Sequence, residues 1–175
     1  QGMAAILLAG FDCFFRTGEL FSLTVGAVEF IGNGAIIRLD STKGLQRALT
    51  VNTLSEVVVV ESKLAIKWLK KACKGKSSDA LLLGIPAATC RKLFSLMIEA
   101  LGLKGKLSFY SLRRGGASWY FLQTNNMDKT AIRGRWAHTA TARVYVQSCL
   151  AEKQRLQLTP EQEQCLAKMV KFLLV

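Results

Sequence analysis

The chain has 175 residues, half of them hydrophobic, which is enough for a compact domain with a sizeable core. It carries 24 lysine and arginine residues against 12 aspartate and glutamate residues, a formal net charge of +12. This charge favours an anionic partner, nucleic acid first, with a membrane surface or solubility alone as alternatives. The five cysteines include no C-x-x-C pair. Neither a zinc ribbon nor a disulfide framework is therefore indicated, and a reduced intracellular compartment fits.

Two helices are expected at the start of the chain. Residues Met3–Phe15 are almost wholly apolar, as in a buried helix, and they lack the length and the basic flank of a membrane anchor. A second, short helix is expected from Arg16 to about Leu23. Glu19 lies three residues after Arg16 and could orient its guanidinium. A simple ion pair between these two side chains is the alternative for Arg16.

The pattern changes to β-type between Ala27 and Val51. Short apolar runs occur at 28–31, 35–39 and 47–51, with turns at 32–34 and 41–44. They predict a three-stranded antiparallel sheet with Lys43 in its second turn. An ordinary exposed lysine is the alternative for Lys43.

Most of the remaining chain is expected to be helical. One helix is predicted over Ser55–Cys73, and its polar side and end carry lysines that could face DNA or only solvent. Loops are expected at 75–79 and 123–126, and helices at 86–101, 128–133 and after the capping box of Thr159–Gln162. The fold class is therefore mainly α with a small antiparallel sheet (α+β). The lysines on the polar side and end of the helix predicted at 55–73 are Lys63, Lys67, Lys70, Lys71, Lys74 and Lys76.

The stretch from Ser108 to Tyr145 carries the candidate chemistry. Ser108 is expected to cap a helix on which Tyr110 and Arg113 share a face. The planar guanidinium of Arg113 suits two oxygens of a phosphate.

Tyr145 is the ninth residue after Trp136, so one continuous helix would place them on opposite faces. The two can converge only if the chain turns near residues 137–141. Thr139 or Thr141 is expected to cap the helix that follows. A packed core residue is the alternative for Trp136.

These residues resemble the catalytic domain of the tyrosine recombinases of the phage-integrase type. R-T-G-E at Arg16–Glu19 is similar to the motif that opens this domain, and Lys43 to its β-hairpin lysine. Arg113, Trp136 and Tyr145 match its later motifs in order and separation. The runs R-R-G-G-A-S and G-R-W look most like those of eukaryotic tyrosine-recombinase retroelements and related mobile elements. Tyr110 stands where this family has a histidine.

The resemblance implies DNA strand cleavage and rejoining, as in recombination or integration, with Tyr145 as the nucleophile and a 3′-phosphotyrosyl intermediate. Arg16 and Arg113 would bind the phosphate, Trp136 would add a donor, and Lys43 would protonate the departing 5′-hydroxyl. No metal, cofactor or ATP is implied. The candidate catalytic residues are Arg16, Lys43, Tyr110, Arg113, Trp136 and Tyr145, and further DNA contacts are expected at Arg47, Arg114, Arg133 and Arg135.

The implied partners are double-stranded DNA and other copies of the chain, as a dimer or tetramer, in the nucleus if the source is eukaryotic. Residues 1–175 are expected to form a single catalytic domain, with the family's N-terminal core-binding domain absent. The helix in 159–175 has an apolar stripe that either docks on its own domain or passes to a neighbouring protomer. The stripe consists of Leu166, Met169, Val170, Leu173 and Leu174.

Two other functions stay open. Tyr110 in place of histidine fits a DNA-binding domain that descends from such an enzyme but cleaves poorly or not at all. The second is a basic helical interaction module whose match to the motif arises by chance. In that case the candidate residues would not lie together in one cleft.

Overall fold

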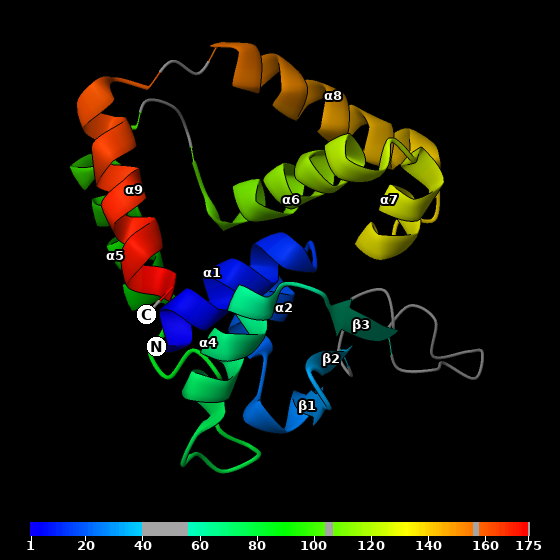
Figure 1. Cartoon of the computed structure of the whole chain (residues 1–175). Coiled ribbons are helices and arrows are strands. Elements are labelled where there is room, and N and C mark those ends of the chain that lie inside the picture. The colour runs from blue at the N-terminus through cyan, green and yellow to red at the C-terminus, as the bar shows by residue number, and fades with distance from the viewer. Residues whose placement is uncertain (40–55, 104–106, 156–157, 175) are drawn as a thin grey trace. The chain divides into compact units, whose positions relative to one another are not determined.

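The computed structural model describes residues 1–39, 56–103, 107–155 and 158–174 (Figure 1). The chain divides into two compact units, Gln1–Ile85 and Pro86–Val175. In the described residues, the first unit combines helices with a sheet and the second is helical.

Two helices form the core of the N-terminal unit. Helix α1 (Gly2–Asp12) and helix α4 (Lys63–Cys73) pack against each other (Figure 1). Their contact buries small and aliphatic side chains, among them Ile6 and Leu69, which have no exposed surface. The short helix α2 (Thr17–Ser22) follows α1 after Phe14, which has a positive φ of 51°. The two expected N-terminal helices are thus confirmed.

Three antiparallel strands complete the N-terminal unit, after the 3₁₀ turn η1 (Val25–Ala27). Strands β1 (Val28–Ile31), β2 (Gly34–Leu39) and β3 (Glu56–Val60) pair in the order β1-β2-β3. On β2, Ile37 pairs with Val28 on one side and Val58 on the other, and all three are buried. One face of the sheet therefore belongs to the core, and the predicted three-stranded antiparallel sheet is confirmed.

The third strand differs from the expected one. The run at 47–51 and the turn that carries Lys43 lie outside the described residues, whereas Glu56–Val60, expected to begin a helix, is strand β3. Four consecutive valines explain the difference, because β-branched side chains favour a strand over a helix. Helix α4 begins only after Ser62, whose hydroxyl accepts a hydrogen bond from the backbone N–H of Ala65 at 3.2 Å.

The buried carboxylate of Asp12 links the end of α1 to the start of α4. Its Oδ2 accepts hydrogen bonds from the backbone N–H groups of Glu61 at 2.9 Å and Ser62 at 3.1 Å. These N–H groups precede the helix and have no intrahelical partner, so the side chain from a distant part of the sequence satisfies them.

Five helices make up the described part of the C-terminal unit. They are α5 (Ala87–Ala100), α6 (Phe109–Thr124), α7 (Met127–Gly134), α8 (Thr139–Arg155) and α9 (Pro160–Leu174). Helices α6 and α8 lie side by side, and α7 packs on both (Figure 1). The loop expected at 123–126 is shorter than predicted, because α6 continues to Thr124 and only Asn125 and Asn126 separate it from α7. Asn125 takes a left-handed conformation with φ 47°, and the Asn126 side chain caps α7.

Helix α9 starts at the predicted capping box. Thr159 N donates to Gln162 Oε1 at 3.0 Å, and Gln162 N donates to Thr159 Oγ1 at 3.3 Å. The Gln162 amide also donates to the backbone carbonyl groups of Leu101 at 3.1 Å and Gly102 at 2.8 Å, after α5. No residue of α9 is buried. In the described parts of the chain, no helix has the length and apolar character needed to cross a membrane.

We predict that Asp12→Ala lowers the free energy of unfolding by roughly 2 kcal/mol or more, because it leaves two N–H groups without their acceptor. Urea denaturation followed by circular dichroism measures this change. Asp79→Ala, which removes an exposed carboxylate from a loop, is the matched control and should change stability by less than about 0.5 kcal/mol. Equal effects of the two substitutions would contradict the role given to Asp12.

Candidate active site

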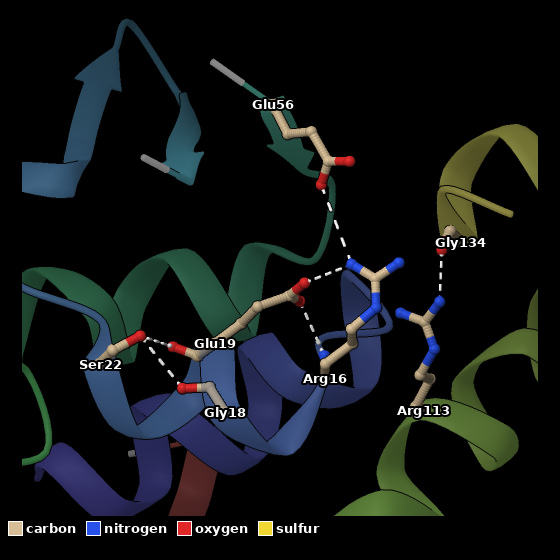
Figure 2. Close-up of polar contacts among 7 residues, drawn as sticks. All are labelled: Arg16, Gly18, Glu19, Ser22, Glu56, Arg113 and Gly134. Carbon is tan, nitrogen blue, oxygen red and sulfur yellow. Dashed lines mark hydrogen bonds and ion pairs between the residues drawn. The ribbon is translucent and has the colours of Figure 1, made fainter. Parts of the chain in front are cut away.

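Arg16 lies in the N-terminal unit, directly before helix α2. Its Nη1 donates to Glu19 Oε1 at 2.6 Å and lies 4.0 Å from Glu56 Oε2, while its backbone N–H donates to Glu19 Oε2 at 2.7 Å (Figure 2). The Arg16 side chain is 43% exposed, whereas that of Glu19 is 4% exposed. The buried carboxylate thus holds an accessible guanidinium in one orientation. The expected pairing with Glu19 is confirmed, and Glu56 is an acidic neighbour that the sequence did not reveal, because its strand was read as a helix.

In the C-terminal unit, four of the candidate residues come together from α6, from α8 and from the turn after α7. They are Tyr110, Arg113, Trp136 and Tyr145. This turn is the break in the helix that the spacing of Trp136 and Tyr145 requires. Arg135 ends α7 with a left-handed φ of 57°, and α8 begins at Thr139. The residue that precedes α8 is the exposed His138, so the expectation that Thr139 or Thr141 caps this helix was wrong.

Arg113 is the buried centre of this cluster, with 2% of its surface exposed. Its Nη2 donates to the backbone carbonyl of Gly134 at 2.6 Å (Figure 2). Its guanidinium carbon lies 4.4 Å from the ring centroid of Trp136. A buried charge needs such partners, and both the carbonyl dipole and the electron-rich indole face stabilise a cation.

Gly134 is the position where α7 and Trp136 approach most closely. A Cβ atom at Gly134 would lie only 1.9 Å from Trp136 Cζ3. Glycine therefore lets the indole approach the end of α7 closely, while the carbonyl of the same residue accepts the hydrogen bond from Arg113.

Trp136 and Tyr145 form a stacked pair, with ring centroids 5.3 Å apart and an angle of 28° between the rings. The Tyr145 hydroxyl is also 2.5 Å from the hydroxyl of Tyr110, which approaches edge-on at a centroid distance of 5.9 Å. The phenol oxygen of Tyr145 is thus located by contacts from two different segments.

Arg114 fixes the next turn of the same two helices. Its Nη2 donates to Ser148 Oγ at 2.6 Å, and Ser148 Oγ donates to the Tyr145 carbonyl at 3.1 Å. This chain of bonds links α6 to the turn of α8 that bears Tyr145. Sequence reasoning missed Ser148, although its position three residues after Tyr145 places it on a neighbouring part of the same helix face.

The Tyr110 phenol has an altered acidity. Partial burial of a residue that stays 40% exposed, the hydrogen bond to Tyr145 and electrostatic interaction with Tyr145 raise the pKa of Tyr110 to about 12, against the lowering effect of Arg113 and Arg114. The Tyr110 hydroxyl is therefore neutral and keeps its proton near pH 7.

The other candidates for DNA contacts lie in varied settings. The guanidinium of Arg133 stacks 5.0 Å from the ring centroid of Tyr120. Arg135 occupies the left-handed position at the end of α7. Lys43 and Arg47 lie outside the described residues. Among the residues that the structure describes, no three histidine, cysteine, aspartate or glutamate side chains form a group that could hold a metal ion.

Comparison with solved structures identifies the fold. The chain is similar to a XerA recombinase, with a TM-score of 0.62, 15% identity and coverage of 96% of this chain and 56% of that one. It is also similar to the XerH site-specific recombinase bound to difH substrate in a pre-cleavage complex, with a TM-score of 0.58, 16% identity and coverage of 81% and 41%. A post-cleavage complex of XerH with palindromic difH substrate matches with a TM-score of 0.58, 15% identity and coverage of 87% and 44%.

The fold is that of the tyrosine recombinases. No protein-family model and no curated protein sequence matches the chain. The chain spans between 41% and 56% of the length of these recombinases. The mainly α class with a small antiparallel sheet, expected from the sequence, is confirmed.

We predict that Gly134→Ala lowers the free energy of unfolding by about 1 to 3 kcal/mol, because the added methyl group overlaps the Trp136 ring. The indole N–H resonance of Trp136 should shift at the same time, as measured by NMR with ¹⁵N-labelled tryptophan. Gly18→Ala is the matched control. This helical glycine has no atom within 4 Å of its would-be Cβ, so the substitution should be neutral or stabilise by up to about 1 kcal/mol. An unchanged Trp136 resonance in Gly134→Ala would show that the packing is different.

Proposed function

We propose that this chain cleaves and rejoins DNA strands as a tyrosine recombinase does, through a covalent bond between Tyr145 and a 3′-phosphate. The supporting observation is the cluster in the C-terminal unit, where the Tyr145 phenol lies against Trp136, which in turn contacts the buried Arg113. The recombinase fold and the net charge of +12 point the same way.

The first step of the proposed reaction is attack by the Tyr145 oxygen on a phosphodiester. A free tyrosine phenol has a pKa near 10, so phenols are poor nucleophiles at neutral pH until positive charge nearby favours loss of the proton. In the proposed reaction the phenol proton passes to water, and the oxygen forms a bond to phosphorus.

The two arginines have the task of stabilising the transition state. Arg113 and Arg16 would each donate to non-bridging oxygens of the phosphate, where negative charge builds up as five oxygens surround the phosphorus. Their settings support this task. Arg113 is held by the Gly134 carbonyl and Arg16 by the Glu19 carboxylate, so neither guanidinium has to be ordered on binding. The indole N–H of Trp136 would add a neutral donor.

The leaving group is the 5′-oxygen of the broken strand. Lys43 would supply its proton, since an ammonium group on a flexible chain can follow the departing oxygen. The bond energy stays in the phosphotyrosyl ester, so the reaction needs neither ATP nor a metal ion. A 5′-hydroxyl from another strand would then give recombination, whereas the original strand would reseal the break.

The proposed substrate is double-stranded DNA. Arg47, Arg114, Arg133 and Arg135 are proposed to contribute to binding it. Contacts of such cations to backbone phosphates would position the duplex without reading its sequence, and binding should weaken steeply with salt. Origin in a eukaryotic mobile element, and with it a nuclear location, stays a prediction from the resemblance.

A second candidate function is DNA binding without cleavage. The observation that favours it is Tyr110, a neutral phenol at the position where the resemblance calls for a histidine. Such a protein would retain the basic surface and the fold, and would form no covalent bond to DNA.

We predict that the wild-type chain forms a covalent DNA adduct and that Tyr145→Phe, which lacks the nucleophilic oxygen, forms none. The substrate is a pool of randomised duplexes with a nick, from which a short strand diffuses away after cleavage and traps the intermediate. Adducts are separated under denaturing conditions and sequenced. Tyr120→Phe is the matched control and should form the adduct as the wild type does. Wild-type protein that shifts duplex DNA in a gel but forms no adduct would support the non-cleaving candidate.

We propose that the apolar stripe of α9 is exchanged between protomers, since Val170 is 52% exposed and Leu174 61% exposed. The mass measured by light scattering should rise with concentration above that of one chain. Val170→Glu should abolish the rise because it places a charge in the contact, whereas Gln164→Glu, at an exposed position of the same helix, should not. A mass of one chain at every concentration would exclude exchange in free solution.

A further inference from the structure

The hydroxyl groups of Tyr110 and Tyr145 form a direct contact between two helices. The chain has three tyrosines, and two of them, on α6 and α8, place their oxygens 2.5 Å apart. This distance is at the short end for a hydrogen bond between two hydroxyl groups. Tyr110 is the donor and Tyr145 the acceptor. The two rings also pack edge-on, with an angle of 74° between them.

The contact is built into its surroundings. Tyr110 precedes Arg113 by one turn of α6, so the helix that carries the buried guanidinium also sets the position of the phenol. On the other side, the bond from Arg114 to Ser148 ties α6 to the turn of α8 that follows Tyr145. The two helices that carry these oxygens are therefore joined next to the contact.

We propose that Tyr110 is a hydrogen-bond donor to the nucleophile, holding the Tyr145 oxygen in place while keeping its own proton throughout the reaction. This inference rests on the proposed function, in which Tyr145 attacks the DNA. In the attack step the Tyr145 O–H bond breaks and the Tyr145 proton passes to water. The hydrogen bond from Tyr110 strengthens as the Tyr145 oxygen becomes anionic.

The chemistry of a phenol excludes the role that a histidine could have at this position. A neutral imidazole accepts a proton near pH 7, whereas a phenol can accept one only after it has become a phenolate. The groups that act on the Tyr110 hydroxyl are Tyr145 from α8 and Arg113 and Arg114 from its own helix. Together with burial they leave its pKa at about 12, so the phenolate is scarce at neutral pH.

This role has a consequence for the pH dependence of cleavage. A histidine at position 110 would act as a base only when neutral, so the rate would fall as the pH drops through about 6.5. Tyr110 does not change charge in that range. Cleavage by the native chain should therefore lack any decline that originates at this position between about pH 5 and 8.

The first measurement needs no DNA. Tyrosine labelled with ¹³C at Cζ gives one NMR resonance for each of the three tyrosines, and titration follows each phenol. The Tyr110 resonance should titrate near pH 12 in the native chain and should move toward about 10 in Tyr145→Phe, which removes the hydrogen bond and the interacting oxygen. A Tyr110 pKa that does not respond to Tyr145→Phe would overturn the pairing.

The second measurement is the rate of adduct formation in a single turnover. All proteins carry His138→Asn, so that Tyr110→His introduces the only histidine. Tyr110→Phe should react about tenfold more slowly, as expected for the loss of a hydrogen bond to a charged oxygen. Tyr110→His should recover part of the rate but lose it below about pH 6.5, where the Tyr110 protein does not.

The two measurements separate the two proposals. An unchanged rate in Tyr110→Phe would overturn the role of Tyr110 and leave cleavage by Tyr145 intact. The same holds if the Tyr110 and Tyr110→His proteins decline together at low pH. If the NMR titration shows the pair but no protein forms an adduct, the proposed cleavage itself is refuted.

Discussion

The candidate site of the C-terminal unit depends on the interactions that stabilise the buried guanidinium of Arg113. A cation with 2% exposure is costly unless it is stabilised. Its hydrogen bond to the Gly134 carbonyl and its contact with the Trp136 ring require that α7 ends at Gly134 and that the chain then turns sharply. The left-handed Arg135 accomplishes this turn. Burial of one charge in α6 therefore determines where the indole lies, and the indole in turn determines where the Tyr145 ring can stack.

Contacts between helices α6 and α8 position the Tyr145 phenol. Arg114 and Ser148 join the two backbones, while Tyr110 meets the Tyr145 hydroxyl directly. Arg114, expected from the sequence to contact DNA, thus also has a structural partner within the chain. Three residues of α6 thus each contact a neighbouring segment: Tyr110 and Arg114 contact α8, and Arg113 contacts the end of α7.

The N-terminal unit uses a different means to orient its arginine. Arg16 lies at the start of a helix, where its own backbone N–H and its guanidinium both bind the Glu19 carboxylate. Because Glu19 is buried and Arg16 is not, the pair presents a positive group whose direction is set by the core. A guanidinium that is already oriented loses little conformational entropy if it binds a ligand.

The local pattern of residues by itself determined most of the elements, whereas the resemblance to the tyrosine recombinases singled out Arg113 and the three residues that gather around it. Helical periodicity, the capping box at Thr159 and the need for a turn between Trp136 and Tyr145 are short-range properties, so they could be read directly. The strand at Glu56–Val60 was predicted as the start of a helix because periodicity cannot distinguish a short apolar run from part of a buried helix, although its four valines favour a strand. Only the tertiary structure reveals that Arg113 binds the Gly134 carbonyl and that Arg114 binds Ser148. The same is true of the contact between the two phenols. These are contacts between segments far apart in the chain, and their geometry arises from packing, which no spacing within one segment encodes.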